Sequence, residues 1–138
     1  MTLKELSQLY FLRREIDSLR ERLDELRATA TSAPIQTLSD MPASPHNGES
    51  RVERYVVAIA ELETLISDKL EACIQERIRL ERFIETIPDS RLRLIFTYRF
   101  DRGMTWTAVA WRLGGGETVD SVKHACYRFL EASEDAST

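Results

Sequence analysis

The 138-residue sequence has little of the residue types that mark metal and disulfide proteins, with only 2 cysteines and 2 histidines. Cys73 and Cys126 lie far apart and lack the short spacing of a zinc site. Neither His46 nor His124 has a second ligand-type residue at a suitable distance along the chain. The sequence therefore predicts no metal site and two reduced thiols in a cytoplasmic protein.

Long apolar runs are also missing. The first residues include Lys4 and Glu5, so the sequence predicts neither a signal peptide nor a membrane span. The glycines at 114–116 lack the Lys-Ser/Thr that completes a phosphate-binding loop. Paired glutamates such as Glu81 and Glu85 fall on a heavily charged predicted helix, where solvent-exposed faces explain them. We therefore expect no enzyme activity and no cofactor.

The composition that remains, 43% hydrophobic and 30% charged with a net charge of −4, is typical of a small helical protein. Residues 1–30 predict an N-terminal coiled-coil helix, opened by a capping box formed by Thr2 and Glu5. Its apolar residues alternate steps of three and four, as in a coiled-coil seam: Leu9, Leu12, Ile16, Leu19, Leu23 and Leu26.

A second long helix is predicted over residues 51–87, with a capping box from Ser50 to Glu53 and an end at Pro88. At about 1.5 Å per residue it would be roughly 50 Å long. Its near-heptad stripe comprises Val52, Val56, Ile59, Ile66, Leu70, Cys73, Leu80, Ile84 and Ile87.

Residues 31–50, between the two helices, contain prolines and no Lys or Arg, and predict a flexible linker. The apolar seams can serve an intrachain hairpin or pairing with a second chain. We expect a homodimer through the long helices, with a monomeric hairpin as the alternative.

Residues 88–131 predict a three-helix helix-turn-helix domain, followed by a frayed acidic tail at 132–138. Gly103 is expected to end the first helix and Thr105 to cap the second, which stops at Gly114. Thr118 is expected to cap the third. The expected inward residues are Leu92, Ile95, Phe96, Arg99 and Phe100, then Trp106, Val109, Ala110 and Leu113, then Val122, Cys126 and Phe129.

Ser121, Lys123 and His124 stand near the start of the third predicted helix, where a groove-reading helix places its contacts. We expect Trp106 to pack in the trihelical core. Trp111, off the inward side of its helix, is expected to dock on the long second helix or on a partner. The interval from Pro88 to Leu130 has seven Lys/Arg and four Asp/Glu, a modest basic excess.

This region resembles the C-terminal domain of small phage and prophage regulators of the ArpU and RinA type, which is similar in turn to region four of bacterial sigma factors. The resemblance covers about the last third of the chain. It implies that the third helix enters the major groove, that Ser121, Lys123 and His124 contact DNA, and that Arg112 contacts the DNA backbone. The residues that carry it are Asp89, Arg91, Arg99-Phe100, Gly103-Met104-Thr105-Trp106, Val109-Ala110, Leu113-Gly114, Asp120-Ser121-Val122-Lys123 and Arg128-Phe129-Leu130.

The sequence thus predicts an all-α, sequence-specific transcriptional regulator that binds double-stranded DNA. Lys123, His124 and Ser121 would face base edges, while Arg112, Arg91 and Arg93 would neutralise phosphates. The acidic overall charge leaves a second interpretation open. In it, the chain is a helical interaction protein that binds RNA polymerase, a sigma factor or a phage packaging component. A third interpretation is a DNA-packaging adaptor similar to a small terminase subunit, which also joins helical oligomerisation to a helix-turn-helix.

Overall fold

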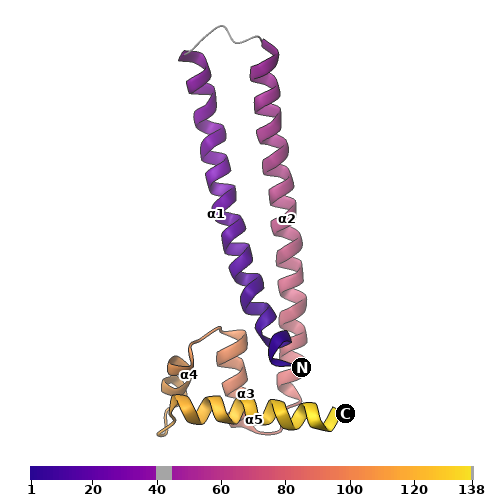
Figure 1. Cartoon of the computed structure of the whole chain (residues 1–138), viewed down its shortest axis with the longest axis vertical. Helices are drawn as coiled ribbons and strands as arrows, with labels where there is room; N and C mark the ends of the chain where they lie inside the picture. Colours follow the sequence, from indigo (N-terminus) through magenta and orange to yellow (C-terminus); the bar gives the residue numbers. More distant parts are fainter. Residues whose placement is uncertain (40–44, 138) are drawn as a thin grey trace. The chain divides into compact units, whose positions relative to one another are not determined.

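The computed structural model describes residues 1–39 and 45–137, and their regular secondary structure is helical throughout, which confirms the all-α prediction. Figure 1 shows the elements in order. They are α1 (Leu3–Ser39), α2 (Pro45–Glu85), α3 (Ser90–Phe96), a π-helical turn η1 (Thr97–Asp101), α4 (Trp106–Leu113) and α5 (Val119–Ser137). None of the described helices is both long and apolar enough to cross a membrane. The chain divides into two compact units, Met1–Arg13 with Ala72–Thr138, and Arg14–Glu71.

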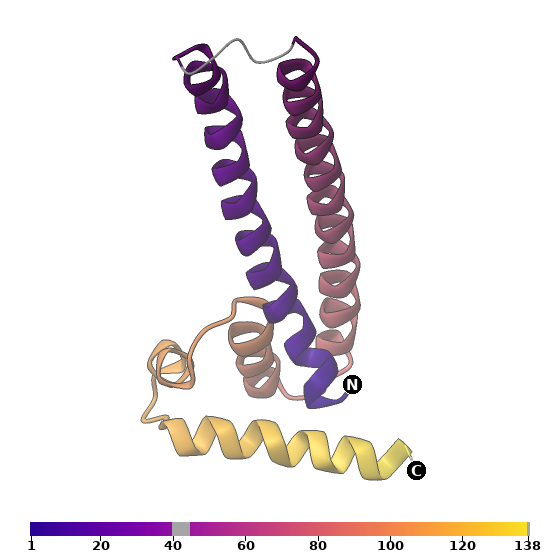
Figure 2. The ribbon, with the colours of Figure 1, turned by 45° about the horizontal axis from the view of Figure 1, so that its top comes forward.

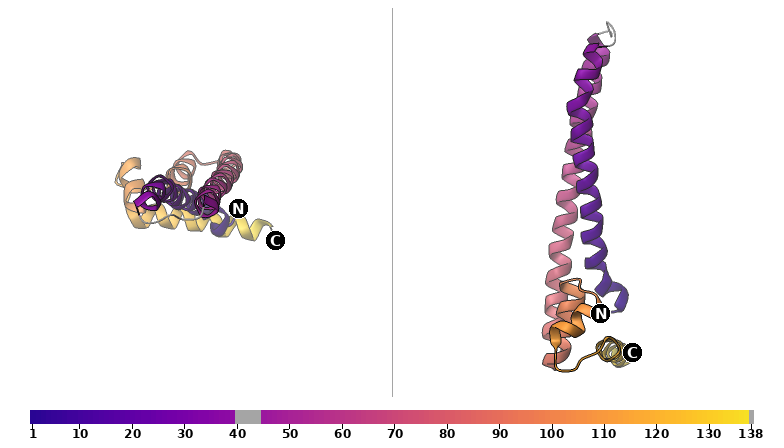
Figure 3. Two further views of the ribbon diagram at one scale, coloured as in Figure 1. Left: turned by 90° about the horizontal axis from the view of Figure 1, so that it is seen from above. Right: turned by 90° about the vertical axis from the view of Figure 1, so that its left-hand side faces the viewer.

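The unit Arg14–Glu71 is a helical hairpin in which parts of α1 and α2 lie side by side (Figure 1, and the left view of Figure 3). Leu23, Leu62 and Ile66 form its buried core, and Leu19, Leu26 and Ile59 pack against them. Two exposed ion pairs join the helices, Lys69 Nζ to Glu15 Oε1 and Arg27 Nη2 to Glu63 Oε1, each at 2.8 Å. Exposed pairs contribute less than about 1 kcal/mol each, so apolar burial holds this hairpin together.

The predicted apolar stripe of α2 divides into two neighbouring faces. Ile66 is buried against α1, together with Leu62, which the predicted stripe did not include, whereas Val52 and Val56 are 52% and 60% exposed. A strict seven-residue repeat drifts by about 20° per heptad around a straight helix. The stripe predicted from sequence therefore includes residues that do not face α1.

Both long helices extend into the segment predicted as a flexible linker at 31–50, so that prediction is wrong for 31–39 and 45–50. Ala28 and Ala30 are strong helix formers, and lengthening an existing helix avoids the cost of nucleating a new one. Pro45 occupies the first position of α2, where a missing N–H costs nothing. The predicted cap at Ser50 consequently falls inside α2. Residues 40–44 of the predicted linker lie outside the described residues.

The other unit is built around one apolar core to which every helix contributes. Phe96 is fully buried at its centre, with the rings of Phe83, Phe100 and Phe129 at centroid distances of 5.9, 5.4 and 5.7 Å. Helix α5 packs on both α3 and α4, as Figure 2 shows. The buried residues are Leu6, Leu9, Leu80, Ile84, Ile87, Ile95, Phe96, Phe100, Val109, Ala110, Val122, Cys126 and Leu130.

This core confirms most of the predicted inward positions, including Val109, Val122 and Cys126. Both cysteines are free, and burial raises the pKa of the Cys126 thiol to about 12, so this thiol stays protonated. The capping box at the start of α1 is also confirmed. Thr2 N donates to Glu5 Oε2 at 2.7 Å, and Glu5 N donates to Thr2 Oγ1 at 3.3 Å.

The helix predicted around Leu92 to Phe100 changes to a wider π-helical turn at Thr97, where Arg102 N donates to Thr97 O at 2.9 Å. Asp101, at the end of this turn, is only 7% exposed. Its Oδ1 lies 3.1 Å from Arg77 Nε and 3.6 Å from Arg13 Nη2, and Arg13 Nη1 donates to its carbonyl oxygen. Asp101 therefore joins α1 and α2 to the end of η1 through a largely buried charge.

The predicted frayed tail at 132–138 is wrong for 132–137, because α5 continues to Ser137. Ala132, Glu134 and Ala136 favour helix and extend one that is already anchored by Leu130. Thr138 lies outside the described residues.

We expect Phe96→Ala to lower the free energy of unfolding by about 3–5 kcal/mol, because it removes a buried ring and leaves a cavity. Trp111→Ala provides a matched control, since Trp111 is 83% exposed. The control should change stability by no more than about 0.5 kcal/mol. Urea unfolding followed by circular dichroism measures both. Equal losses in the two variants would contradict the proposed centre of the core.

Candidate nucleic-acid interface

Helices α4 and α5 are joined by a glycine turn whose backbone geometry only glycine adopts readily. Gly114, Gly115 and Gly116 have φ values of 67°, 64° and 81°, in the left-handed region. Gly114 N donates to Ala110 O at 3.2 Å, which closes α4. At the other end of α4, Thr105 Oγ1 accepts from Ala108 N at 3.2 Å, as predicted. The boundaries of α4 are thus fixed by residue type at both ends.

Helix α5 begins with a reciprocal capping box. Ser121 N donates to Thr118 Oγ1 at 3.1 Å, and Thr118 N donates to Ser121 Oγ at 2.9 Å. This confirms the predicted cap at Thr118. It also uses Ser121, one of the predicted base contacts, to fix the first turn of the helix.

Glu117, just before this cap, links the turn to α3. Arg91 donates to it through Nε at 2.6 Å and through Nη2 at 2.9 Å, and Ser121 Oγ donates to Glu117 Oε2 at 2.6 Å. The hydrogen bonds from Arg91, followed by that from Ser121, hold the pKa of Glu117 at about 2. The negative charge of Glu117 is therefore paired within the chain, and so is the positive charge of Arg91.

Arg93, another predicted phosphate contact, is also committed to hydrogen bonds within the chain. Its Nη1 donates to Ile87 O at 2.6 Å and its Nη2 donates to Ser90 Oγ at 2.7 Å. These bonds close the connection between α2 and α3. The structure therefore places Ser121, Arg91 and Arg93 in the support of the turn and of α3.

Helix α5 carries the remaining candidates: His124 and Arg128 lie opposite the buried Val122 and Cys126, and Lys123 lies beside that buried face. His124 and Arg128 are exposed and Lys123 is half-buried. Among the described residues, no ion pair engages any of these three side chains. Their positive or ionisable groups are therefore available to a partner.

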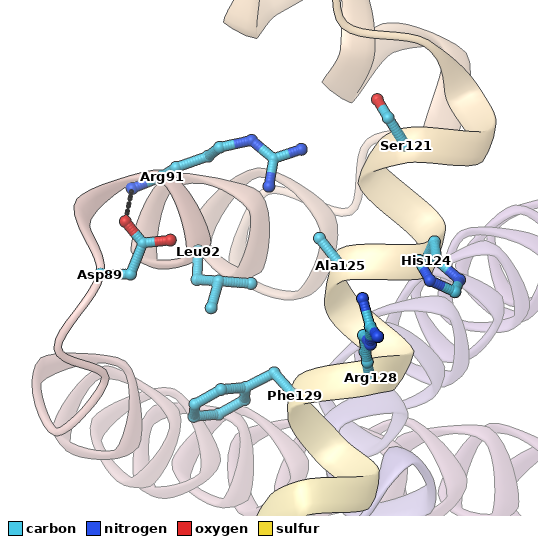
Figure 4. Close-up of a pocket in the computed structure, with 8 residues that line it drawn as sticks. All are labelled: Asp89, Arg91, Leu92, Ser121, His124, Ala125, Arg128 and Phe129. Atoms are coloured by element: carbon cyan, nitrogen blue, oxygen red, sulfur yellow. Dashed lines mark hydrogen bonds between the residues drawn. The ribbon is translucent and has the colours of Figure 1, made fainter.

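An open hollow of about 530 Å³ lies between α3 and α5 (Figure 4). His124 and Arg128 border it on α5, and Leu92, Ala125 and Phe129 form its apolar surface. Its lining also includes Asp89, Arg91 and Ser121. Arg128 was not among the predicted DNA contacts, although its position one helical turn after His124 places both on the same face.

Arg112 on α4 is exposed, and its Cζ lies 5.8 Å from the centre of the Tyr98 ring. A cation resting on an aromatic face keeps its charge while its side chain is oriented. Arg112 is thus a fourth available cationic or ionisable group, from the helix that precedes α5.

The two tryptophans differ in environment. Trp106 is partly buried against the core, as predicted, with Tyr127 at a centroid distance of 6.0 Å and Arg99 Cζ 4.7 Å from its ring centre. Trp111 is 83% exposed, so the first predicted alternative, docking on the second helix, is wrong, and docking on a partner stays a prediction. Its position opposite the Val109 and Ala110 face of α4 turns it to solvent.

In the part of the chain that the structure describes, no group of three or more His, Cys, Asp or Glu side chains could hold a metal ion. Comparison with known proteins gives no match to any family model, to any curated protein or to any solved structure.

We expect the Glu117 interactions to make stability depend on pH in the acid range. The folded-state pKa of about 2 lies below the ordinary value of 4.5, so the stabilisation is complete above about pH 4.5 and is lost as pH falls toward 2. Because the Glu117 side chain is 20% exposed, solvent screening keeps the effect near or below about 1 kcal/mol.

Denaturant titrations at several pH values between 5 and 2 measure this effect for the wild type and for Glu117→Gln. The wild type should lose its stability advantage over the variant as pH falls. A difference between the two proteins that stays constant with pH would contradict the assignment.

Proposed function

We propose that this chain is a sequence-specific, double-stranded-DNA-binding transcriptional regulator of phage or prophage origin. In this proposal α4 and α5 act as a helix-turn-helix and α5 enters the major groove. The observation that carries the proposal is that Lys123, His124 and Arg128 on α5 have no ion-pair partner among the described residues. They lie just past a firmly capped, glycine-fixed turn.

We assign the DNA contacts to side chains that are not held by ion pairs or hydrogen bonds within the part of the chain that the structure describes. Lys123 and His124, in the first turns of α5, would reach base edges, since the N-terminal part of a reading helix makes those contacts. Arg112 and Arg128 would pair with phosphates. Ser121, Arg91 and Arg93 would act indirectly, by holding the start of α5 and the connection to α3 in place.

Charge pairing within the chain reduces the repulsion that two acidic side chains would exert on an anionic partner. The turn before α5 carries Glu117, which by itself would repel phosphate, but Arg91 compensates its charge at 2.6 Å. Asp101 is likewise compensated, by Arg77 and Arg13. Two of the four acidic residues between Pro88 and Leu130 are therefore neutralised locally.

Lys123→Ala should weaken DNA binding by about 1 kcal/mol, close to fivefold, because a direct base or phosphate contact is lost. A high-affinity duplex is first selected from a random double-stranded pool and then titrated in a fluorescence anisotropy assay. Lys69→Ala is the matched control, because it removes the same charge from a lysine that pairs with Glu15 in the hairpin.

The control variant should bind like the wild type. Failure of the wild type to select any duplex at moderate salt would refute DNA binding. Equal affinities of the two lysine variants would remove Lys123 from the interface.

The exposed Trp111 favours one alternative function, an interaction protein that binds RNA polymerase, a sigma factor or a phage packaging component. Large aromatic side chains that stand in solvent are typical anchors of protein interfaces. Under this alternative, immobilised protein would retain purified polymerase, Trp111→Ala would abolish the retention, and no duplex would be selected. A small-terminase-like adaptor would instead show a native mass larger than a dimer.

A further inference from the structure

The open hollow between α3 and α5 has an apolar floor that the core holds in place. Leu92, Ala125 and Phe129 line this floor, and all three pack against the buried core. The Phe129 ring meets the buried Phe96 ring edge to face, at a centroid distance of 5.7 Å. The floor is therefore formed before any ligand binds, which lowers the entropic cost of binding one.

The basic groups that border the hollow differ in whether the chain itself neutralises them. Arg91 pairs with Glu117 at 2.6 Å, so its guanidinium adds no net charge. His124 and Arg128 stand together on the α5 side (Figure 4). No ion pair between described residues engages either side chain. The α5 side of the hollow therefore carries a positive charge that an anionic ligand can pair with.

Asp89, an acidic residue of the lining, lies on the α3 side, across the floor from Arg128 (Figure 4). Its Oδ1 accepts from Arg91 N at 3.2 Å, which caps α3 and orients the carboxylate. A second anionic group of a ligand, placed near Asp89, would be repelled. The lining therefore favours a ligand with one negative charge and an apolar body.

We propose that this hollow is an effector site for a small monocarboxylate with a bulky apolar body, such as an arylalkanoate. Its volume of about 530 Å³ lies in the range of small-molecule sites. Arg128 binds the carboxylate through two parallel hydrogen bonds, and His124 donates a ring N–H to the same group. The apolar body covers Leu92, Ala125 and Phe129. Binding of the ligand does not require that the chain bind DNA.

The effect of the ligand on DNA binding, by contrast, rests on the proposed function. There His124 contacts a base edge and Arg128 contacts a phosphate. Neither side chain can pair with a carboxylate and with DNA at the same time. A bound carboxylate therefore releases the chain from its duplex.

The first test is a titration of the isotope-labelled full chain, followed through its backbone amide NMR signals at constant ionic strength. The probe is phenylpropionate, and phenylpropanol is the matched control with the same ring and no charge. Phenylpropionate should give saturable shifts at Leu92, Ala125 and Phe129 with a dissociation constant of about 1 mM. Phenylpropanol should bind about tenfold more weakly, because it lacks the charge-assisted hydrogen bonds.

The absence of saturable shifts up to about 20 mM phenylpropionate would overturn the proposal, since the site would then be too weak to respond to an effector. Equal binding of the alcohol would overturn it as well. So would shifts that centre on residues outside the hollow.

The role of Arg128 is tested with Arg128→Gln, which should raise the dissociation constant of phenylpropionate about tenfold and leave that of phenylpropanol unchanged. Arg102→Gln is the matched control, because Arg102 is also exposed and lies outside the lining. The control should bind like the wild type. Circular dichroism checks that both variants keep their helix content. Equal effects of the two substitutions would overturn the proposal.

The preference for a single charge is tested with phenylsuccinate, which has the same ring and two carboxylates. It should bind the wild type about threefold more weakly than phenylpropionate does, because Asp89 repels the second carboxylate. Asp89→Asn keeps a residue that caps helices well and should remove this difference. A ratio that the substitution leaves unchanged would overturn the assignment of Asp89.

The effector role is measured last, with the duplex selected for the wild type. Saturating phenylpropionate should raise the dissociation constant of that duplex about fivefold or more, whereas phenylpropanol should not. An unchanged affinity would overturn the effector role. Failure to select any duplex would instead refute the proposed function. The ligand titrations contain no DNA and decide the binding site independently.

Discussion

Burial of the Phe96 ring is the constraint on which the C-terminal helices depend. Helix α3 has 7 residues and α4 has 8, lengths at which isolated helices do not form in water. Their order comes from packing on shared apolar side chains, with Phe96 in contact with aromatic rings from α2, η1 and α5. Caps and glycines then determine where each short helix starts and stops, and so determine which α5 side chains reach solvent.

The polar side chains around the turn between α4 and α5 fall into two groups, those that bond to one another and those that have no ion-pair partner in the described part of the chain. Glu117, Arg91 and Ser121 satisfy one another and fix the start of α5, whereas Lys123, His124 and Arg128 lack an ion-pair partner among the described residues. The division has a physical reason. In the DNA complex that we propose, α5 needs rigid support, and a side chain that provides this support through hydrogen bonds is not available to contact the DNA. Residues close in sequence to a proposed interface can therefore be essential to it without touching the partner.

Local rules predicted the C-terminal helices well, because caps and glycines act over a few residues. Thr105, Thr118 and Gly103 were assigned correctly for that reason. Ion pairs between residues that lie far apart in the chain could not be predicted from the sequence. Arg91 forms its ion pair with Glu117, which lies 26 residues further along the chain, and Asp101 forms one with Arg13 of another helix. The periodicity of the sequence does not indicate which residues form such pairs. The long helices run past their predicted ends because a helix that has already formed extends at little cost. The predicted stripe of α2 divides into two faces because a strict seven-residue repeat drifts around a straight helix.

The position of Asp101 has a consequence for how the chain can be divided. Leu6 and Leu9, from the first turns of α1, are buried in the same core as Phe96, and Arg13 faces the Asp101 carboxylate. The C-terminal segment is therefore completed by residues from the opposite end of the polypeptide. A fragment that begins at Pro88 would expose apolar core residues and leave the Asp101 carboxylate without Arg13 and Arg77. The C-terminal segment therefore does not fold as an independent domain, although its sequence resembles one.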